Sequence, residues 1–386
     1  MRIATIITLS LSIIAWACVE TFDIPDSSSS QMLVVEGVLS SQLKRHQIYL
    51  SRSTALNENR VVYEPGAIVT ITDHEGEVLQ LTEVSDGVYE TPEYAAEPGR
   101  TYKLYIKTEN GSEYESASVP FTDGPDIANV YAAYGKNPRG NDKGVQVYLD
   151  TESPGSPGHY YRWNYIETYE VRAPFPSNWV WLGGTDLEFR IDGIDTCYVT
   201  DTLKNIILHN TFELEQDKVT AFTLRYIHES EYMLRHRYSI LAQQFCLSEE
   251  AYQYWDNLRV ISEEQGSLSD RQPGTIKGNI VSLTNPEETV LGYFDAAKVS
   301  EKRILFSAIN FYYDGLKMPP PLRSDCFDIP PISFMQWELP VMMPRYESTM
   351  LIWEVAGMSP SITVSLMPKS CCDCRNLGPT DKPDFF

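Results

Sequence analysis

Short segments in which apolar and polar residues alternate fill the first part of the chain. Asp-Gly and Asn-Gly pairs, at 86–87 and 110–111, separate several of them, and such pairs between alternating runs predict β-hairpins. Strands spaced about every 8 to 12 residues predict an immunoglobulin-like β-sandwich over residues 31–122. The expected strands are 32–39, 47–52, 67–72, 77–82, 101–107 and 114–119.

The same pattern continues after the turn-forming segment 122–126, and it predicts a larger β-rich domain over residues 123–369. One helix is expected near 248–264. Ser248 is a suitable N-cap, and apolar residues recur at helical spacing from Tyr252 to Ile261. The last residues, 370–386, have little periodicity, and we expect a cysteine-rich tail that packs on the second domain. The predicted fold is therefore mostly β, with one main α-helix and a disulfide-stapled C-terminal tail.

The chain begins with a different pattern. Residues 1–17 carry an arginine, an apolar run and small residues near position 17, as a secretory signal peptide does. Cys18 follows directly, at the position where a bacterial lipobox places its lipidated cysteine. Residues 18–30 are acidic and serine-rich, which is typical of a flexible tether. We therefore expect a lipid anchor on Cys18.

Charge narrows the classes of partner. The formal net charge is −22, and a nucleic-acid-binding protein needs clustered Lys and Arg instead. We expect no binding of nucleic acid. No later segment is long and apolar enough for a transmembrane helix, so we expect the lipid to be the attachment to the membrane.

Six cysteines remain after Cys18, and an exported chain favours disulfides between them. We expect one bridge between Cys197 and Cys246, and we expect Cys326 to pair within the terminal cluster. A zinc site on that cluster (Cys371, Cys372 and Cys374) is the weaker alternative, because structural zinc usually takes two Cys-x2-Cys type pairs and the sequence has one tight cluster. The disulfide candidates are Cys197, Cys246, Cys326, Cys371, Cys372 and Cys374.

No catalytic motif is present in the sequence. It contains no His-Glu-x-x-His, Gly-x-Ser-x-Gly, P-loop or Gly-x-Gly-x-x-Gly pattern. The many carboxylates offer no means of choosing a glycosidase pair. We expect a non-enzymatic protein with no cofactor and no metal, and an unrecognised hydrolase is the less favoured alternative.

Two further features are candidates for surface function. Phe175, Trp179 and Trp181 lie in a loop-like stretch after Pro174, and aromatic residues are enriched in interfaces. Thr202 lies in an Asp-Thr-Leu sequence that resembles a bacterial O-glycosylation pattern. We expect an interface at the three aromatic residues, and Thr202 is the candidate for O-glycosylation.

Several segments together resemble the domain-of-unknown-function family 4249, which comprises outer-membrane lipoproteins of Bacteroidota. The resemblance covers nearly the whole mature chain and implies no catalytic residues. Members of this family are often encoded beside TonB-dependent transporter-like barrels. The segments are Leu33-Val-Val-Glu-Gly-Val, Leu247-Ser-Glu-Glu-Ala-Tyr-Gln-Tyr-Trp, Gly278-Asn-Ile, Pro286-Glu-Glu-Thr-Val-Leu-Gly-Tyr-Phe, Cys372-Asp-Cys-Arg-Asn-Leu-Gly and Lys382-Pro-Asp-Phe-Phe.

These observations favour a lipid-anchored accessory protein of the outer membrane, exposed at the cell surface or facing the periplasm. Its expected partner is an outer-membrane barrel protein, in nutrient capture or in the assembly of a surface complex. The alternative is a stand-alone glycan- or peptide-binding module. That alternative requires an exposed aromatic platform, which we would place around Trp179 and Trp181.

Overall fold

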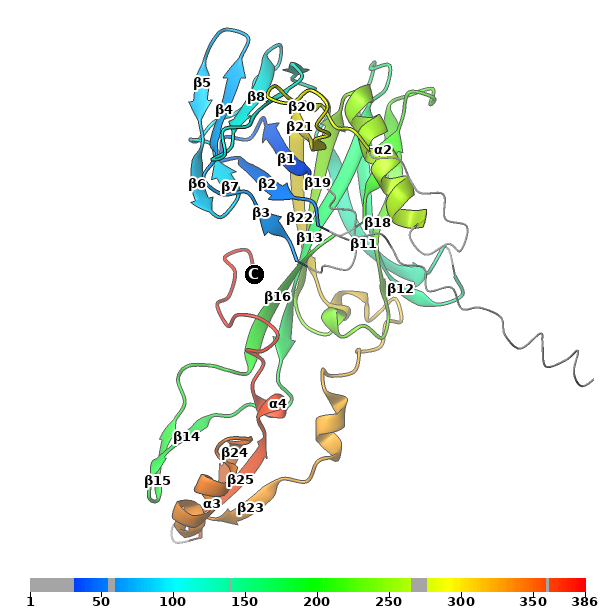
Figure 1. The fold of residues 1–386 in the computed structure, drawn as a ribbon. Helices are drawn as coiled ribbons and strands as arrows, with labels where there is room; N and C mark the ends of the chain where they lie inside the picture. Colours follow the sequence, from blue (N-terminus) through cyan, green and yellow to red (C-terminus); the bar gives the residue numbers. More distant parts are fainter. Residues whose placement is uncertain (1–30, 55–59, 139, 204, 265–275, 359–360) are drawn as a thin grey trace, which may run out of the picture.

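The computed structural model describes residues 31–54, 60–138, 140–203, 205–264, 276–358 and 361–386. It is mostly β, with several sheets and few helices, as the alternating pattern predicts. Two β domains lie side by side in the body of the molecule, and a smaller lobe projects from their lower end (Figure 1). In the described ranges, no helix has the length and apolar character needed to cross a membrane.

The first domain is a sandwich of two six-stranded sheets. Inward-facing residues alternate with outward-facing ones, as in β8, where Tyr102, Leu104 and Ile106 are buried in the core. One sheet contains β1 (Leu33–Ser40), β2 (Gln47–Arg52), β3 (Val62–Tyr63), β6 (Thr82–Ser85), β7 (Val88–Glu90) and β21 (Leu291–Ala297). The other contains β4 (Ile68–Asp73), β5 (Val78–Gln80), β8 (Thr101–Lys107), β9 (Glu113–Ser116), β10 (Val119–Pro120) and β20 (Ile280–Ser282).

The boundary predicted at residue 122 is therefore wrong for this sandwich. Strands β20 and β21, some 160 residues further along, complete its two sheets, and β21 pairs in parallel with β1. Gly292 permits this close approach, because a Cβ there would lie 1.8 Å from the carbonyl oxygen of Val35 in β1. Gly278 in turn abuts Gly292, and a Cβ on Gly278 would lie 1.5 Å from the Gly292 carbonyl oxygen. The Asn279 side chain bonds both the N–H and the C=O of Phe294. Hairpin signals act between neighbours in sequence, so they could not reveal these distant strands.

The second domain is built on two sheets around a core that includes Trp163 and Tyr238. Its long strand β13 lies between β19 on one side and β16 and β17 on the other. The sheets contain β11 (Ile127–Lys136), β12 (Lys143–Glu152) and β18 (Lys218–His228), and β13 (Tyr160–Arg172), β16 (Thr196–Thr202), β17 (Ile207–Asn210), β19 (Tyr238–Leu247) and β22 (Val299–Phe306). The 3-10 helices η1 (Tyr232–Leu234) and η2 (Ala308–Phe311) pack against them.

The main helix lies where the sequence predicts it. Helix α2 spans Glu249–Glu264, and the Ser248 hydroxyl accepts the N–H of Ala251 as an N-cap does. The helix contacts β13, β17 and β19 of the second domain and β21 of the sandwich. It therefore lies across the junction of the two domains.

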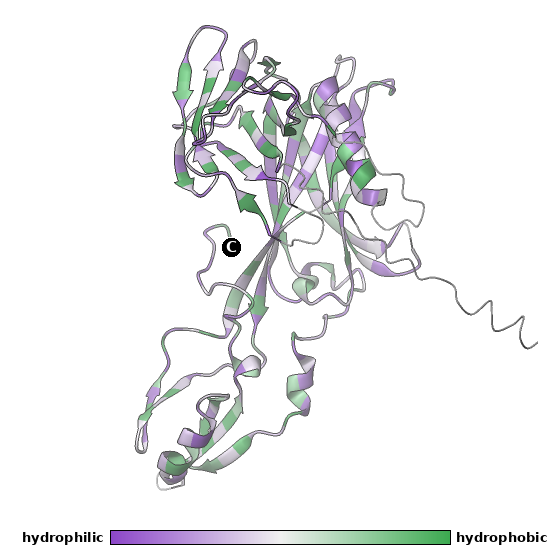
Figure 2. Ribbon diagram, in the orientation of Figure 1, coloured by the Kyte–Doolittle hydropathy of each residue, from purple (hydrophilic) through white to green (hydrophobic). Residues whose placement is uncertain are grey.

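The distal lobe is a third unit, which the prediction of a single domain over residues 123–369 did not separate from the rest. Two separate insertions form it, residues 173–191 and 324–368, and hydrophobic residues recur through its elements (Figure 2). Its elements are the hairpin β14 (Trp179–Gly183) and β15 (Asp186–Phe189), β23 (Ile332–Met335), β24 (Met350–Ala356), β25 (Thr363–Pro368), α3 (Leu339–Tyr346), η3 (Ser324–Asp328) and η4 (Gln336–Glu338). Helix α4 (Lys369–Cys372) then leads into the C-terminal tail.

Candidate functional site

The distal lobe has a small core of its own. Phe334, Leu339 and Ile352 are buried in it, and the half-buried Trp179 and Trp181 of the hairpin pack against them. Helix α3 and strand β24 both contact β14. The two insertions thus form one packed unit, although more than 130 residues separate them in sequence.

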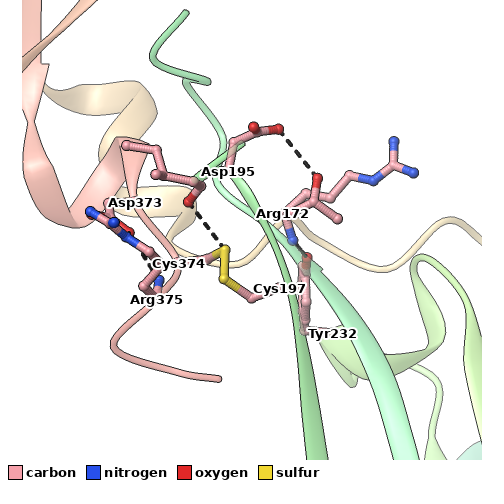
Figure 3. Close-up of a disulfide and its surroundings, with 9 residues drawn as sticks. Arg172, Asp195, Cys197, Tyr232, Asp373, Cys374 and Arg375 are labelled. Atoms are coloured by element: carbon pink, nitrogen blue, oxygen red, sulfur yellow. Dashed lines mark hydrogen bonds and ion pairs between the residues drawn. A yellow bond between two sulfur atoms is a disulfide. The ribbon is translucent and has the colours of Figure 1, made fainter. Parts of the chain in front are cut away.

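Two disulfides hold the base of this lobe. Cys326 pairs with Cys371, which confirms that Cys326 bonds within the terminal cluster. Cys197 of β16 pairs with Cys374 (Figure 3), and the Cys374 N–H donates to Ile194 C=O at 2.9 Å. The tail is therefore linked covalently to β16, the strand that follows the β14–β15 hairpin of the lobe.

The predicted bridge between Cys197 and Cys246 is wrong. Cys246 lies opposite Tyr161 on one edge of β13, whereas Cys197 lies opposite Val171 on the other edge. These positions are ten residues apart (171 − 161) along the strand, or about 33 Å at the usual rise per residue. Sequence spacing carried no information about which sides of β13 the two strands would occupy.

Cys246 and Cys372 are free and buried. Burial raises the pKa of each thiol to about 12. The thiolate is the reactive form of cysteine, so neither residue is suited to act as a nucleophile at neutral pH. Both were disulfide candidates from the sequence, and the structure pairs neither.

The three aromatic interface candidates all belong to the distal lobe or its base, but they do not form an exposed platform. Phe175 packs with its ring centroid 5.1 Å from those of Phe327 and Trp353. Trp179 contacts Phe189 edge-to-face, and Trp181 Nε1 donates to a main-chain carbonyl at 2.9 Å. The expected platform around the two tryptophans is therefore wrong, because both rings cover the core of the lobe.

Other side chains of the lobe, which the sequence analysis did not single out, carry the exposed apolar surface. Trp337 of η4 is 66% exposed and Val341 of α3 is 59% exposed. The hairpin turn lies beside them, because Gln336 Nε2 donates to Thr185 C=O at 2.9 Å. Among the lobe residues that the structure describes, the large exposed apolar side chains are Leu182, Phe189, Ile191, Phe327, Trp337, Val341 and Met358. We call this set the lobe patch.

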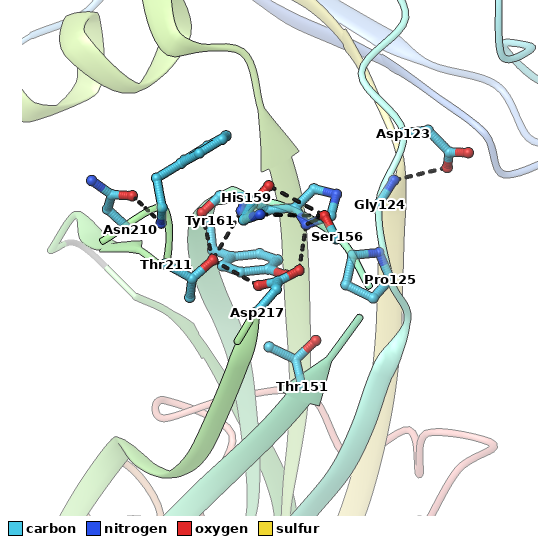
Figure 4. A network of polar contacts seen from close by, with 12 residues as sticks. Asp123, Gly124, Pro125, Thr151, Ser156, His159, Tyr161, Asn210, Thr211 and Asp217 are labelled. Atoms are coloured by element: carbon cyan, nitrogen blue, oxygen red, sulfur yellow. Dashed lines mark hydrogen bonds and ion pairs between the residues drawn. The ribbon is translucent and has the colours of Figure 1, made fainter. Parts of the chain in front are cut away.

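A polar cluster at the start of β13 is the arrangement most similar to a catalytic site (Figure 4). Asp217 accepts hydrogen bonds from Tyr161 and Thr211, and its Oδ2 lies 2.5 Å from His159 Nδ1. Ser156 Oγ also approaches Nδ1, at 3.4 Å. In a catalytic triad the acid and the nucleophile bind opposite ring nitrogens. Here they share one, so the cluster joins the start of β13 to the loop before β18 and does not activate Ser156.

The remaining predicted sites are placed as follows. Thr202 is exposed at the end of β16, a position that an O-glycan could reach, and its glycosylation stays a prediction. Cys18 lies outside the described residues. No group of three or more potential metal-ligating side chains occurs in the ranges that the structure describes.

The chain matches one protein family. The model of the domain of unknown function DUF4249 matches residues 19–303. No curated protein matches. Among solved structures, a DUF4785 family protein from Legionella pneumophila is similar over 55% of this chain, at 11% identity and a TM-score of 0.18. The chain spans about half the length of that protein, 52%.

Proposed function

This chain belongs to the domain-of-unknown-function family 4249, and from that premise we propose that it is a non-enzymatic accessory lipoprotein of the bacterial outer membrane. In this proposal Cys18 carries the lipid, and the distal lobe docks on an outer-membrane barrel protein of the TonB-dependent transporter type. The complex would serve nutrient capture or the assembly of a surface structure.

The lobe patch is the observation that carries the proposal. Ile191 is 96% exposed and Met358 is 86% exposed, and the patch also includes the indole of Trp337. The described part of the lobe thus exposes seven large apolar side chains on one small unit, and Trp, Phe and Met among them are residue types enriched in protein interfaces. The partner would bury side chains that water now surrounds.

The construction of the lobe also supports a docking role. The Cys326–Cys371 bridge closes its base, and the Cys197–Cys374 bridge fixes the adjoining tail to β16. A lobe held in this way loses little conformational freedom on binding, and preorganisation of this kind favours affinity.

Affinity purification tests the proposal. The lipidated wild-type protein, extracted from native outer membrane in detergent, is expected to retain a barrel protein. The variant Trp337→Ala/Val341→Glu is expected to lose it, because a buried carboxylate at the interface is costly. Val281→Glu is the matched control: Val281 is also 59% exposed, but it lies on β20 of the sandwich.

The control is expected to retain the partner as well as the wild type does. If no barrel protein accompanies the wild type, or if the lobe variant retains it fully, the docking proposal fails. Circular dichroism of both variants verifies that each is folded.

A further inference from the structure

A cavity lies at the junction of the two domains, between helix α2 and the paired strands β1 and β21. Its volume is about 410 Å³, within the range of small-ligand sites, and its walls are mostly apolar. Trp255, Leu258 and Ile261 form the helical wall, and Val35 and Leu291 belong to the strands opposite. A second cavity of about 260 Å³ adjoins it and shares Glu36 and Trp255 with it. We call the two together the junction cavity.

The polar end of the junction cavity contains Arg162 of β13. Its guanidinium carbon lies 4.2 Å from the ring centroids of both Phe245 and Trp255. Its Nε atom is buried and has no hydrogen-bond partner. Within the described part of the chain, no carboxylate lies within ion-pair distance of Arg162. The rings pack against the guanidinium but use none of its N–H donors.

An unused buried donor is unfavourable, and a ligand that accepts from it would remove that cost. A guanidinium offers two parallel N–H groups, which match the two oxygens of a carboxylate. Burial lowers the pKa of Arg162, and the nearby charges of Glu36 and Asp295 oppose this effect. Arginine nevertheless remains cationic in proteins, so it favours an anionic group at this end of the cavity.

Glu36 adds a second requirement. It is exposed on β1 and lines both parts of the junction cavity, so any ligand there meets a negative charge as well as a positive one. A simple fatty acid would satisfy Arg162 but would bring a second carboxylate close to Glu36. A ligand with one carboxylate, one ammonium group and an apolar body satisfies both charged residues and the apolar walls.

We propose that the junction cavity binds a short apolar peptide through its free termini. The peptide carboxylate would accept hydrogen bonds from the Arg162 guanidinium, the peptide ammonium would pair with Glu36, and the apolar side chains would fill the space beneath α2. The cavity lies in the body of the protein, away from the lobe patch. A negative result for peptide binding would therefore leave the docking proposal untouched, and a negative result for docking would leave this inference untouched.

Isothermal titration calorimetry with four probes tests the inference. The probes are the dipeptide Leu-Phe, its C-terminal amide, its N-acetyl form and dodecanoate. The free dipeptide is expected to bind to the full-length protein. Amidation and acetylation should each weaken binding about ten- to hundred-fold, because each removes one charged hydrogen-bonding group.

Two variants assign these effects to residues. Arg162→Met is expected to bind the free dipeptide and its amide equally, and Glu36→Gln is expected to bind the free dipeptide and its N-acetyl form equally. Arg303→Met is the matched control, since Arg303 also packs on an aromatic ring, that of Phe385, but outside the cavity. This control should keep both preferences.

Arg162→Lys guards against a folding defect, because it keeps the charge and loses only the paired donors. It should retain part of the preference for the free carboxylate. The inference is overturned if none of the peptides binds, if dodecanoate alone binds, or if Arg162→Met keeps the wild-type preference for the free carboxylate.

Discussion

Removing the bridge between Cys197 and Cys374 should destabilise the protein measurably and loosen the C-terminal tail. The perturbation is the double substitution Cys197→Ser/Cys374→Ser. The bridge joins residues 177 positions apart, and it connects the tail to β16 beside the base of the distal lobe (Figure 3). A bridge over so long a loop greatly restricts the unfolded chain.

The chain-entropy relation gives the magnitude. For a loop of 177 residues the relation yields about 5 kcal/mol at 25 °C. The Cys326–Cys371 bridge lies inside this loop and shortens it by 45 residues, which lowers the value by only about 0.3 kcal/mol. Removing a native bridge typically costs about 2 to 5 kcal/mol, so about 5 kcal/mol is the upper end of the expected loss.

Some contacts of the tail should survive the substitution. The Tyr198 N–H donates to Pro379 C=O at 2.8 Å, and the ring of Phe386 lies 5.3 Å from that of Tyr198. The guanidinium of Arg303 also packs on Phe385. We therefore expect the tail to remain docked but to open more often, with faster amide exchange over residues 374–386.

Urea unfolding followed by circular dichroism measures the loss of stability, and hydrogen exchange measures the opening of the tail. Cys372→Ser is the control, because Cys372 is equally buried in the same region but unpaired. That variant should lose only packing energy and keep slow exchange in the tail. A double variant that unfolds within about 1 kcal/mol of the wild type would refute the reasoning.

Three further predictions concern the junction of the domains. Gly292→Ala should lower the free energy of unfolding in urea by more than about 2 kcal/mol, because φ is +97° and the new Cβ would lie 1.8 Å from a β1 carbonyl oxygen. Gly99→Ala is the control, since Gly99 also has a positive φ of +83° but faces open space. Its loss of unfolding free energy should be clearly smaller. Burial raises the pKa of the Asp295 carboxyl group from 3.8 to about 6, so the folded protein binds its proton more tightly than the unfolded chain does. Protonation of Asp295 therefore stabilises the fold by about 3 kcal/mol. This stabilisation is complete below pH 3.8 and is lost as the pH rises through 6. Asp295→Asn should therefore match the wild type in calorimetry at pH 3.5 and exceed it at pH 8, and equal melting temperatures at pH 8 would contradict this. Ser248→Ala should lower the unfolding free energy by about 1 kcal/mol through loss of the N-cap, and an unchanged urea midpoint would count against that role.

The family segments have a physical explanation in the fold. Gly278 abuts Gly292, and Asn279 bonds both main-chain groups of Phe294, so the Gly278-Asn-Ile segment is bound to the Leu291-Gly-Tyr-Phe segment of β21. Gly292 in turn lets β21 pair closely with β1 at Val35. Tyr254 of the helical segment packs against Tyr293, with ring centroids 5.0 Å apart. The resemblance therefore marked residues that assemble the domain junction.

The sequence by itself determined the secondary structure of much of this protein, through interactions between residues that are close in the chain. Alternation of apolar residues predicted the mostly β fold, and Ser248 with the helical spacing after it predicted α2 within a residue of its bounds. These features depend on neighbours in the chain. They can be read in sequence because hydrogen bonding within a helix or hairpin involves residues only a few positions apart.

Only the tertiary structure decided which distant segments meet. The pairing of β21 with β1, the bridge from Cys197 to Cys374 and the assembly of the distal lobe each join residues more than 100 positions apart. The proposed peptide site depends on the same kind of meeting, because Glu36, Arg162 and Trp255 come from three separate elements. Such contacts depend on the burial of surfaces from remote parts of the chain, and residue spacing along one sequence does not encode which surfaces those will be.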